Sequence, residues 1–160
     1  MEIRNATIED WKEIAAVEAA CFPPAEAATE ESIRRRLEMY ANHFWLLFEE
    51  DQLISFVNGM VTNEPDLRDE MYEDASLHDE NGEWQMIFGV DTIPSHRRKG
   101  YAEKVLWETI KCSEEQGRKG LVLTCKDYMI HYYAKFGFVN EGVSESVHGN
   151  VMWYQMRLTF

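Results

Sequence analysis

Residues 89–102, G-V-D-T-I-P-S-H-R-R-K-G-Y-A, have the residue types and spacing that best suit the binding of an anion. A strand is expected to end in this stretch and a helix to begin at Gly100. The N–H groups and dipole of a helix N-terminus attract phosphate, and Gly100 and Ala102 let it approach the backbone closely. Basic side chains add positive charge in an otherwise acidic chain: Arg97, Arg98 and Lys99. The stretch therefore predicts a pyrophosphate site, with a solvated basic turn as the alternative.

Two common phosphate-binding fingerprints, G-x-G-x-x-G and the P-loop, are absent from this stretch. The pattern Arg97-x-x-Gly100-x-Ala102, after a strand and at a helix start, instead resembles the R/Q-x-x-G-x-G/A signature of the GNAT superfamily of N-acetyltransferases. The resemblance implies acetyl-CoA as cosubstrate, with pantetheine paired like an added strand and the pyrophosphate held by the loop. The residues so implied are Val90, Asp91 and Thr92 beside pantetheine, and Arg97, Arg98, Lys99, Gly100, Tyr101, Ala102 and Glu103 around the pyrophosphate.

A second stretch, residues 131–138, reads H-Y-Y-A-K-F-G-F and resembles the tail of the same family pattern. In that family a tyrosine lies near the sulfur of the coenzyme, and the resemblance gives this place to Tyr133. A phenol with a pKa of about 10 stays protonated at neutral pH, so Tyr133 would act as a general acid toward the departing thiolate. A core tyrosine is the alternative. The adjacent Tyr132 points elsewhere on a helix and is the natural control.

A third stretch, residues 21–29, reads C-F-P-P-A-E-A-A-T. With residues 125–127, it resembles the arylalkylamine N-acetyltransferase branch and its polyamine-acetylating relatives. In part of that branch a glutamate helps to deprotonate the amine through water, and Glu26 matches it; a solvated loop carboxylate is the alternative. Vertebrate members carry two histidines where this chain has Met86 and Phe88, so their indole-ethylamine substrate is not assumed.

The elements that position these residues are predicted from hydrophobic periodicity and from breakers. Strands are expected over residues 2–6, 44–48, 53–61, 84–93, 121–125, 138–147 and 151–158, and helices over about 11–21, 30–40, 102–116 and 128–135. The acidic segment 63–83 is too long for an ordinary connection, which indicates a functional or mobile loop with room for a helical turn. With the resemblance, this order predicts an α/β (α+β) fold: one GNAT-type domain over 1–160, a mixed, mostly antiparallel, bent sheet, about four helices, and a cofactor-holding splay between strands 84–93 and 121–125.

Composition limits the function further. The chain has 160 residues, enough for one domain, and a net charge of −13 that argues against nucleic acid and against an anionic membrane surface. This charge would attract a cationic small molecule, unless it serves only solubility. No apolar run could cross a bilayer and the first residues lack a secretion signal, so a cytoplasmic location is expected. Three cysteines and five histidines show no metal-ligand spacing, so neither a disulfide nor a metal is expected.

Together these features predict an acetyl-CoA-dependent N-acetyltransferase that acts on a small primary amine, by direct transfer in a ternary complex. Backbone N–H groups of residues 90–92 would stabilise the oxyanion. The acidity favours a polyamine, whereas an arylalkylamine would suit the available aromatic residues, Phe22, Trp45, Trp153 and Tyr154, with His148 as a further pocket candidate. The alternatives are acetylation of a protein N-terminus or lysine, and a coenzyme-A-binding regulatory protein without turnover. A homodimer stays open.

Overall fold

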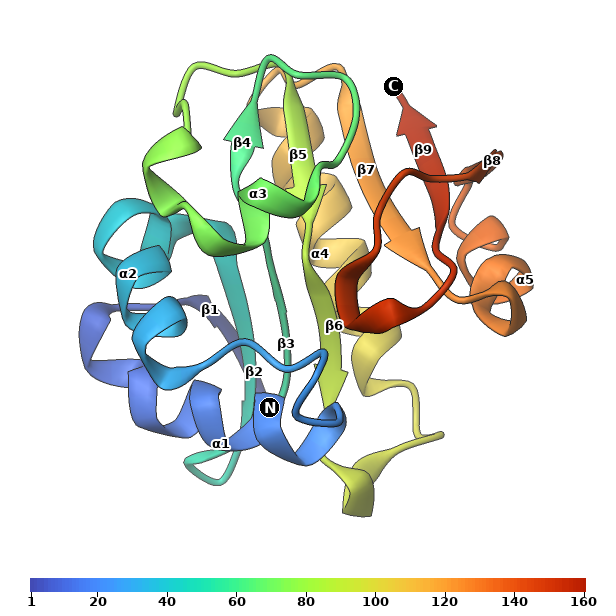
Figure 1. Ribbon diagram of the computed structural model, residues 1–160. Helices are drawn as coiled ribbons and strands as arrows, with labels where there is room; N and C mark the ends of the chain where they lie inside the picture. The colour runs from blue at the N-terminus through green and yellow to red at the C-terminus, as the bar shows by residue number, and fades with distance from the viewer.

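The computed structural model describes residues 1–160 as a layered α/β structure (Figure 1). The strands are β1 (Glu2–Asn5), β2 (Phe44–Glu49), β3 (Gln52–Asn58), β4 (Val61–Thr62), β5 (Trp84–Ile87), β6 (Gly89–Thr92), β7 (Gly120–Cys125), β8 (Val139–Val143) and β9 (Tyr154–Thr159). The α-helices are α1 (Trp11–Cys21), α2 (Glu30–Tyr40), α3 (Asp69–Glu73), α4 (Tyr101–Glu115) and α5 (Ile130–Ala134). The element order matches the prediction, with one α-helix and two strands more than expected. None of the helices is long and apolar enough to span a bilayer.

The strands form two sheets, in the orders β1-β2-β3-β6 and β4-β5-β7-β9-β8. All pairs are antiparallel except β5 and β7, which run parallel. Because β5 pairs with β7 while β6 pairs with β3, the chain passes from one sheet to the other within residues 84–92. Figure 1 shows β6 and β7 drawing apart below β5. The predicted splay between these strands is therefore confirmed.

The break between β5 and β6 faces a matching break between β3 and β4. The Phe88 N–H donates to the Asn58 carbonyl at 2.7 Å and the Met86 N–H to the Met60 carbonyl at 2.8 Å, so the two chains stay paired across the break. A Cβ on Gly59 would lie 1.8 Å from the Met86 carbonyl oxygen, so only glycine fits there. The sequence predicted one strand over 53–61 and one over 84–93; the structure divides each in two.

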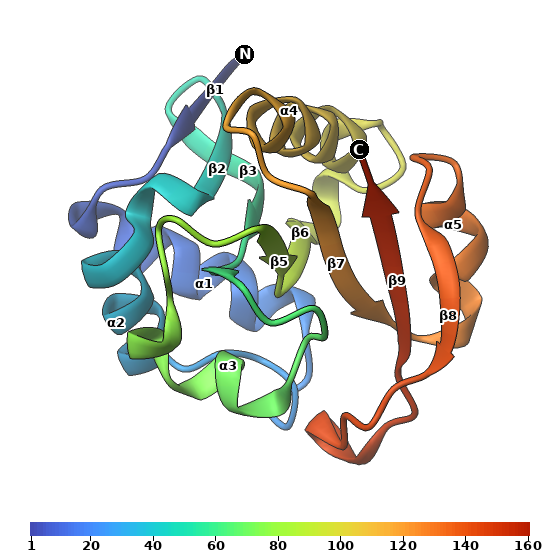
Figure 2. The same ribbon diagram turned by 90° about the horizontal axis from the view of Figure 1, so that it is seen from above.

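The core lies on both faces of the β2–β3 hairpin. Alternate residues of β2 point to opposite faces, as strand geometry requires. One set packs with α1 and α2, namely Phe44, Leu46 and Phe48, and the other packs with α4, namely Trp45 and Leu47. Figure 2 shows α1 and α2 on one side of this sheet and α4 on the other. The sheet edge formed by β6 is thus held between helices of both layers.

The acidic segment 63–83 is anchored to the rest of the fold. Leu67 and Met71 are buried in the core, and α3 and a 3₁₀ turn provide local structure. The Asp69 carboxylate accepts hydrogen bonds from the Ser146 hydroxyl and from the Val147 N–H. The segment is therefore packed against the rest of the fold, and the expected helical turn is present as α3.

Candidate active site

A cavity of about 770 Å³ lies where the α1–α2 connection, β6, β7 and the residues before β9 meet. Three predicted site residues line it: Glu26, Val90 and Tyr133. The loop 97–103 lies outside the cavity, at the other end of β6. The structure therefore separates a buried compartment from the predicted pyrophosphate loop and joins them by one short strand.

The outer edge of β6 has no partner strand. The Ile93 N–H donates to the Ile54 carbonyl at 2.9 Å, and hydrogen-bonded pairs alternate along an antiparallel ladder. By this alternation the peptide groups of Val90 and Thr92 point away from β3, toward the gap. The Thr92 carbonyl already accepts from Arg97 Nε at 3.2 Å. Val90 therefore offers the free backbone edge beside the cavity.

The side chain of Asp91 does not reach this edge. It is fully buried toward α1, and neither of its carboxyl oxygens has a hydrogen-bond partner. Burial, and then the negative charge of Glu18, raises the pKa of Asp91 well above its usual value. The alternation along β6 also turns the Asp91 peptide groups toward β3, and its carbonyl accepts from Ser55 Oγ at 2.6 Å. Of the residues predicted to lie beside pantetheine, Asp91 therefore presents neither its side chain nor its backbone to the gap.

The loop at the start of α4 has the geometry of a helix N-terminus open to solvent. Gly100 precedes the helix with φ of +83°, a left-handed conformation that favours glycine, and nothing lies within 4 Å of the place where its Cβ would be. The basic side chains of residues 97–99 are exposed. The N–H groups of the first turn have no acceptor within the helix. Glu103 pairs with Lys135 of the segment after α5 at 3.5 Å, so its backbone alone remains for an anion.

Tyr133 is buried, and its hydroxyl makes no hydrogen bond within the protein while lining the cavity. Burial raises its pKa far above the usual value for a phenol, so it holds its proton across the working pH range. Tyr132 packs edge-on against Tyr133 with ring centroids 5.1 Å apart but does not line the cavity. Burial raises the pKa of Tyr132 to about 12. The two neighbours thus differ in location, as the helical spacing predicted.

Glu26 is not a solvated carboxylate. Its side chain is 8% exposed and lies 3.0 Å from Lys126 Nζ, and that ammonium also lies 5.8 Å from the centre of the Trp153 ring. A Cβ on Gly149 would lie 2.7 Å from Glu26 Cγ, so the chain passes closely over this carboxylate. The ion pair with Lys126 joins residues 100 apart and was not foreseen from the sequence.

Of the four aromatic residues expected at the acceptor pocket, two line the cavity: Phe22 and Trp153. The prediction is wrong for Trp45, which alternation along β2 places in the core beneath α4. It is also wrong for Tyr154, which lies on β9 opposite Cys125 of β7 and does not line the cavity.

His148, the further pocket candidate, does line the cavity. Its ring stacks on Tyr72 at 4.8 Å, and its Nε2 lies 2.8 Å from the Glu26 carbonyl oxygen. The segment before β9 is therefore fixed against both α3 and the α1–α2 connection.

Sequence reasoning missed Glu18, a buried carboxylate that also lines the cavity. The signal was present: Glu18 lies four residues after the fully buried Ile14, and this spacing puts both side chains on the core face of α1. A carboxylate at a core position needs a partner or a function.

The cysteines are free thiols. Cys21 donates to the Thr92 carbonyl at 3.2 Å, and burial raises its pKa. Burial also raises the pKa of Cys125 to about 11. Both line the cavity as protonated groups, which disfavours a thiolate nucleophile there.

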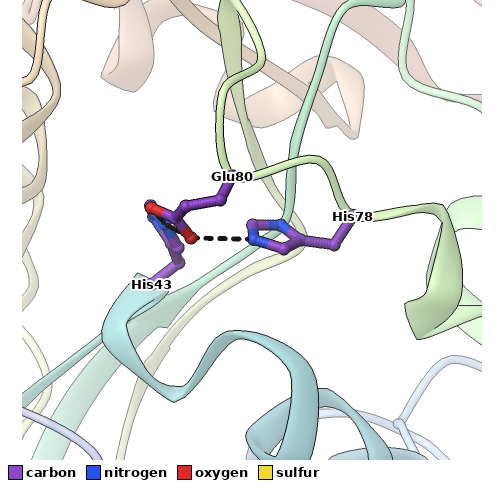
Figure 3. Close-up of side chains that lie close together, drawn as sticks. All are labelled: His43, His78 and Glu80. Atoms are coloured by element: carbon purple, nitrogen blue, oxygen red, sulfur yellow. Dashed lines mark hydrogen bonds and ion pairs between the residues drawn. The ribbon is translucent and has the colours of Figure 1, made fainter.

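His43, His78 and Glu80 lie close together beside the first residue of β2 (Figure 3), with their ligand atoms within 4.8 Å of one another. The Val61 N–H donates to His78 Nδ1 at 3.0 Å, so His78 Nε2 carries the proton and donates to Glu80 at 2.9 Å. A protonated Nε2 has no free lone pair and cannot bind a metal ion through this atom. The hydrogen bonds therefore indicate a structural role for the cluster. Arg118 adds a further contact to Glu80 at 3.4 Å.

Comparison with known proteins agrees with this geometry. The family model described as "Acetyltransferase (GNAT) family" matches residues 11–138. Similar solved structures include the GphF GNAT-like decarboxylase in complex with isobutyryl-CoA (19% identity, TM-score 0.84, 99% of each chain). Others are the loading GNATL domain of CurA from Lyngbya majuscula (16%, 0.83, 99% of this chain and 96% of that one) and the ribosomal-protein-S18-alanine N-acetyltransferase from Escherichia coli (16%, 0.75, 99% and 92%). At such identities the structures show the fold, while the family model covers most of the sequence: the chain belongs to the acetyltransferase (GNAT) family.

Proposed function

We propose that this protein is an acetyl-CoA-dependent N-acetyltransferase that transfers the acetyl group to a small primary amine. One observation carries the proposal: a cavity reached by the free edge of β6 contains both a protonated phenol, Tyr133, and buried carboxylates, Glu18 and Glu26. The phenol would donate a proton to the leaving thiolate, and the carboxylates would accept the proton that the acceptor ammonium must lose before its nitrogen can attack. Membership of the acetyltransferase family supplies the acyl donor.

Acetyl-CoA would lie along β6. Its pyrophosphate would meet the N–H groups at the start of α4, beside Arg98 and Gly100. Pantetheine would pair with the free peptide groups of Val90 as a further strand, which places the thioester at the mouth of the cavity. The isobutyryl-CoA complex of the GphF decarboxylase, which shares the fold, supports this use of the coenzyme.

The reaction follows from these placements. The ammonium of the acceptor loses a proton to a carboxylate of the cavity, and the neutral nitrogen attacks the thioester carbon. A C–N bond forms, the C–S bond breaks, and backbone N–H groups at the open edge of β6 stabilise the oxyanion between these steps. Tyr133 donates its hydroxyl proton to the sulfur and regains one from the amide nitrogen or solvent. The products are an N-acetylated amine and free coenzyme A.

The cavity favours a small acceptor over a protein. It is bounded by aromatic rings, among them Phe22, Phe88 and Trp153, and by carboxylates from several elements, which outnumber the basic side chains of the lining, namely Arg35, Arg36 and Lys126. Such walls suit a cation with an apolar body, which describes both arylalkylamines and polyamines. Acetylation of a protein N-terminus is the competing function, because the fold is shared with the S18-alanine N-acetyltransferase.

A panel of acceptors tests this proposal. Release of coenzyme A from acetyl-CoA would be measured with polyamines, arylalkylamines, N-terminal peptides and lysine peptides at equal concentration. We expect kcat/KM to be highest for small amines, and the KM of a polyamine to rise more steeply with ionic strength than that of phenethylamine. Turnover confined to peptides would make the protein a protein acetyltransferase. Tight binding of acetyl-CoA with no turnover of any acceptor would make it a regulatory protein.

A further inference from the structure

Three polar side chains converge on the space above Gly89, where β6 begins. A Cβ on Gly89 would lie 2.8 Å from Asp91 Oδ1, 3.6 Å from Asn58 Nδ2 and 3.8 Å from Glu18 Oε1. Gly89 and Glu18 both line the cavity. The missing side chain therefore leaves a hollow in the cavity floor that is bounded by polar atoms.

Two of these three side chains, Asp91 and Asn58, have polar atoms without partners inside the protein. Both carboxyl oxygens of Asp91 and the Nδ2 of Asn58 are buried without a hydrogen bond. Arg36 fixes the amide, since its Nη1 donates to Asn58 Oδ1 at 3.0 Å while its Nη2 donates to the Tyr72 carbonyl at 2.8 Å. A buried polar group without a partner destabilises the fold, so a cluster of such groups calls for a functional explanation.

Glu18 completes the cluster from α1. Its Oε2 accepts the Ala28 N–H at 2.8 Å, which holds the carboxylate in place and leaves Oε1 toward the hollow. Glu18 Oε1 and Asp91 Oδ1 therefore face the same hollow above Gly89 from two different elements. Burial, and then the negative charge of Glu18, raises the pKa of Asp91, so Asp91 retains its proton to a higher pH than an exposed carboxyl group would. Glu18 reaches the cavity, whereas Asp91 lies behind it.

We propose that Glu18 and Asp91 form a proton-sharing pair that accepts the proton of the acceptor amine, with Glu18 as the catalytic group and Asp91 as its positioning partner. The inference rests on the proposed function and names the base of that same site. In this step both carboxyl groups of the pair are ionised before the proton arrives. One N–H bond of the acceptor ammonium breaks, and one O–H bond forms on Glu18. The neutral nitrogen then attacks the thioester, and the pair returns its proton to solvent through the cavity.

Glu26 is less suited to this role. Glu26 is held in an ion pair with the ammonium of Lys126 at 3.0 Å, whereas Glu18 forms no ion pair and faces another carboxyl group across the hollow above Gly89. The titratable groups that face the pair from the surrounding elements are Cys21 on α1, Arg36 on α2, Tyr72 on α3 and Tyr133 on α5. Of these only Arg36 carries a charge at neutral pH, and it opposes the retention of the proton.

The test compares the pH dependence of kcat/KM in the wild type, Glu18→Gln, Asp91→Asn and Glu26→Gln. Glu18→Gln is expected to lose about a hundredfold or more at every pH, in the range of a lost general base. Asp91→Asn should move the ascending limb to lower pH by about one unit or more, because the neutral amide no longer holds the shared proton. Glu31→Gln, which removes an exposed carboxylate at the same cavity, is the matched control and should leave the limb in place.

A readout without turnover accompanies this test. In protein labelled with ¹³C at the Asp and Glu carboxyl carbons, the upper titration of the pair should be visible in the wild type and absent in Asp91→Asn. Asp91→Asn should fold at least as stably as the wild type at neutral pH, because burial disfavours the charge it removes. If amines are turned over but the limb stays fixed in Asp91→Asn and moves in Glu26→Gln, the pair is not the base. If the pair titrates as expected but no amine is acetylated, the proposed function fails. The role of the pair as a base toward amines then fails with it, while the sharing of a proton between Glu18 and Asp91 stands.

Discussion

The two ends of β6 differ in nearly every physical property. At Gly89 the strand meets a cavity whose reactive groups are buried, acidic or protonated, and fixed by contacts with four helices. Beyond Thr92 it meets a loop whose residues 97–99 are exposed and basic, and whose backbone is left-handed at Gly100. In the proposed function the buried groups of the first end would transfer protons, whereas the free N–H groups of the second end would bind the pyrophosphate. Chemistry and coenzyme binding should therefore be separable by mutation.

The largest separation is expected for Tyr133→Phe, which removes one oxygen from the cavity end. We expect kcat to fall about tenfold to thousandfold, near the usual range for proton transfer, with coenzyme A affinity nearly unchanged. Steady-state kinetics would measure kcat, and calorimetry would measure the affinity for coenzyme A. Tyr132→Phe, outside the cavity, should be far milder; equal effects of the two substitutions would break the assignment.

Gly100→Asp should give the reverse result at the loop end. A carboxylate beside the first turn of α4 repels pyrophosphate, so we expect the Kd for coenzyme A to rise about tenfold or more, which is about 1.4 kcal/mol. Gly117→Asp is the matched control, because Gly117 also has a positive φ, of +81°, and open space around it, but lies beyond the C-terminal end of α4. An equal loss of affinity in both variants would mean that strain, and not the site, is responsible.

Lys126→Gln tests how much the Glu26–Lys126 ion pair at the cavity end of β6 contributes to stability. It leaves the Glu26 carboxylate buried without its ammonium, which we expect to cost about 1 kcal/mol, since Lys126 is 28% exposed, and to lower Tm by a few degrees. The double variant with Glu26→Gln should recover most of this loss. Thermal unfolding measures both. A stable single variant would show that the pair contributes little.

The smallest effect on activity is expected at Glu80, far from both ends of β6. Hydrogen bonds from His43 and His78 outweigh burial and lower the pKa of Glu80 to about 2. Since the folded pKa lies below the unfolded one, Glu80 stabilises the fold above about pH 5, and this contribution is lost as pH falls toward 2. Glu80→Gln should therefore lower Tm at pH 7, lose part of the acid dependence, and leave kcat unchanged. A changed kcat would mean that the cluster communicates with the cavity.

The elements and the loop could be predicted from the sequence because their signals are local. Periodicity gives α1 and α4, and Gly100 with its basic neighbours marks a helix start that the structure contains. The short helix with Tyr133 follows from spacing as well. Each of these rests on residues within one or two turns of each other.

The side-chain pairs of the cavity could not be predicted, since they join distant parts of the chain. Glu26 pairs with Lys126 across 100 residues, and Glu18 and Asp91 face the same hollow above Gly89 from different elements. The division of β5 from β6 depends likewise on the close approach of Gly59 to the Met86 carbonyl. Such contacts are fixed by packing, which leaves no local pattern.

The most direct test of acetyl transfer in this cavity is to measure the ratio of acetylated amine to released coenzyme A. Purified protein would be mixed with acetyl-CoA and the best small amine of the panel, and mass spectrometry would count N-acetylated product against free coenzyme A. We predict one acetylamide for each coenzyme A released, with the rate strongly reduced in Tyr133→Phe. Coenzyme A release without an acetylated amine, or full activity in Tyr133→Phe, would contradict acetyl transfer in this cavity.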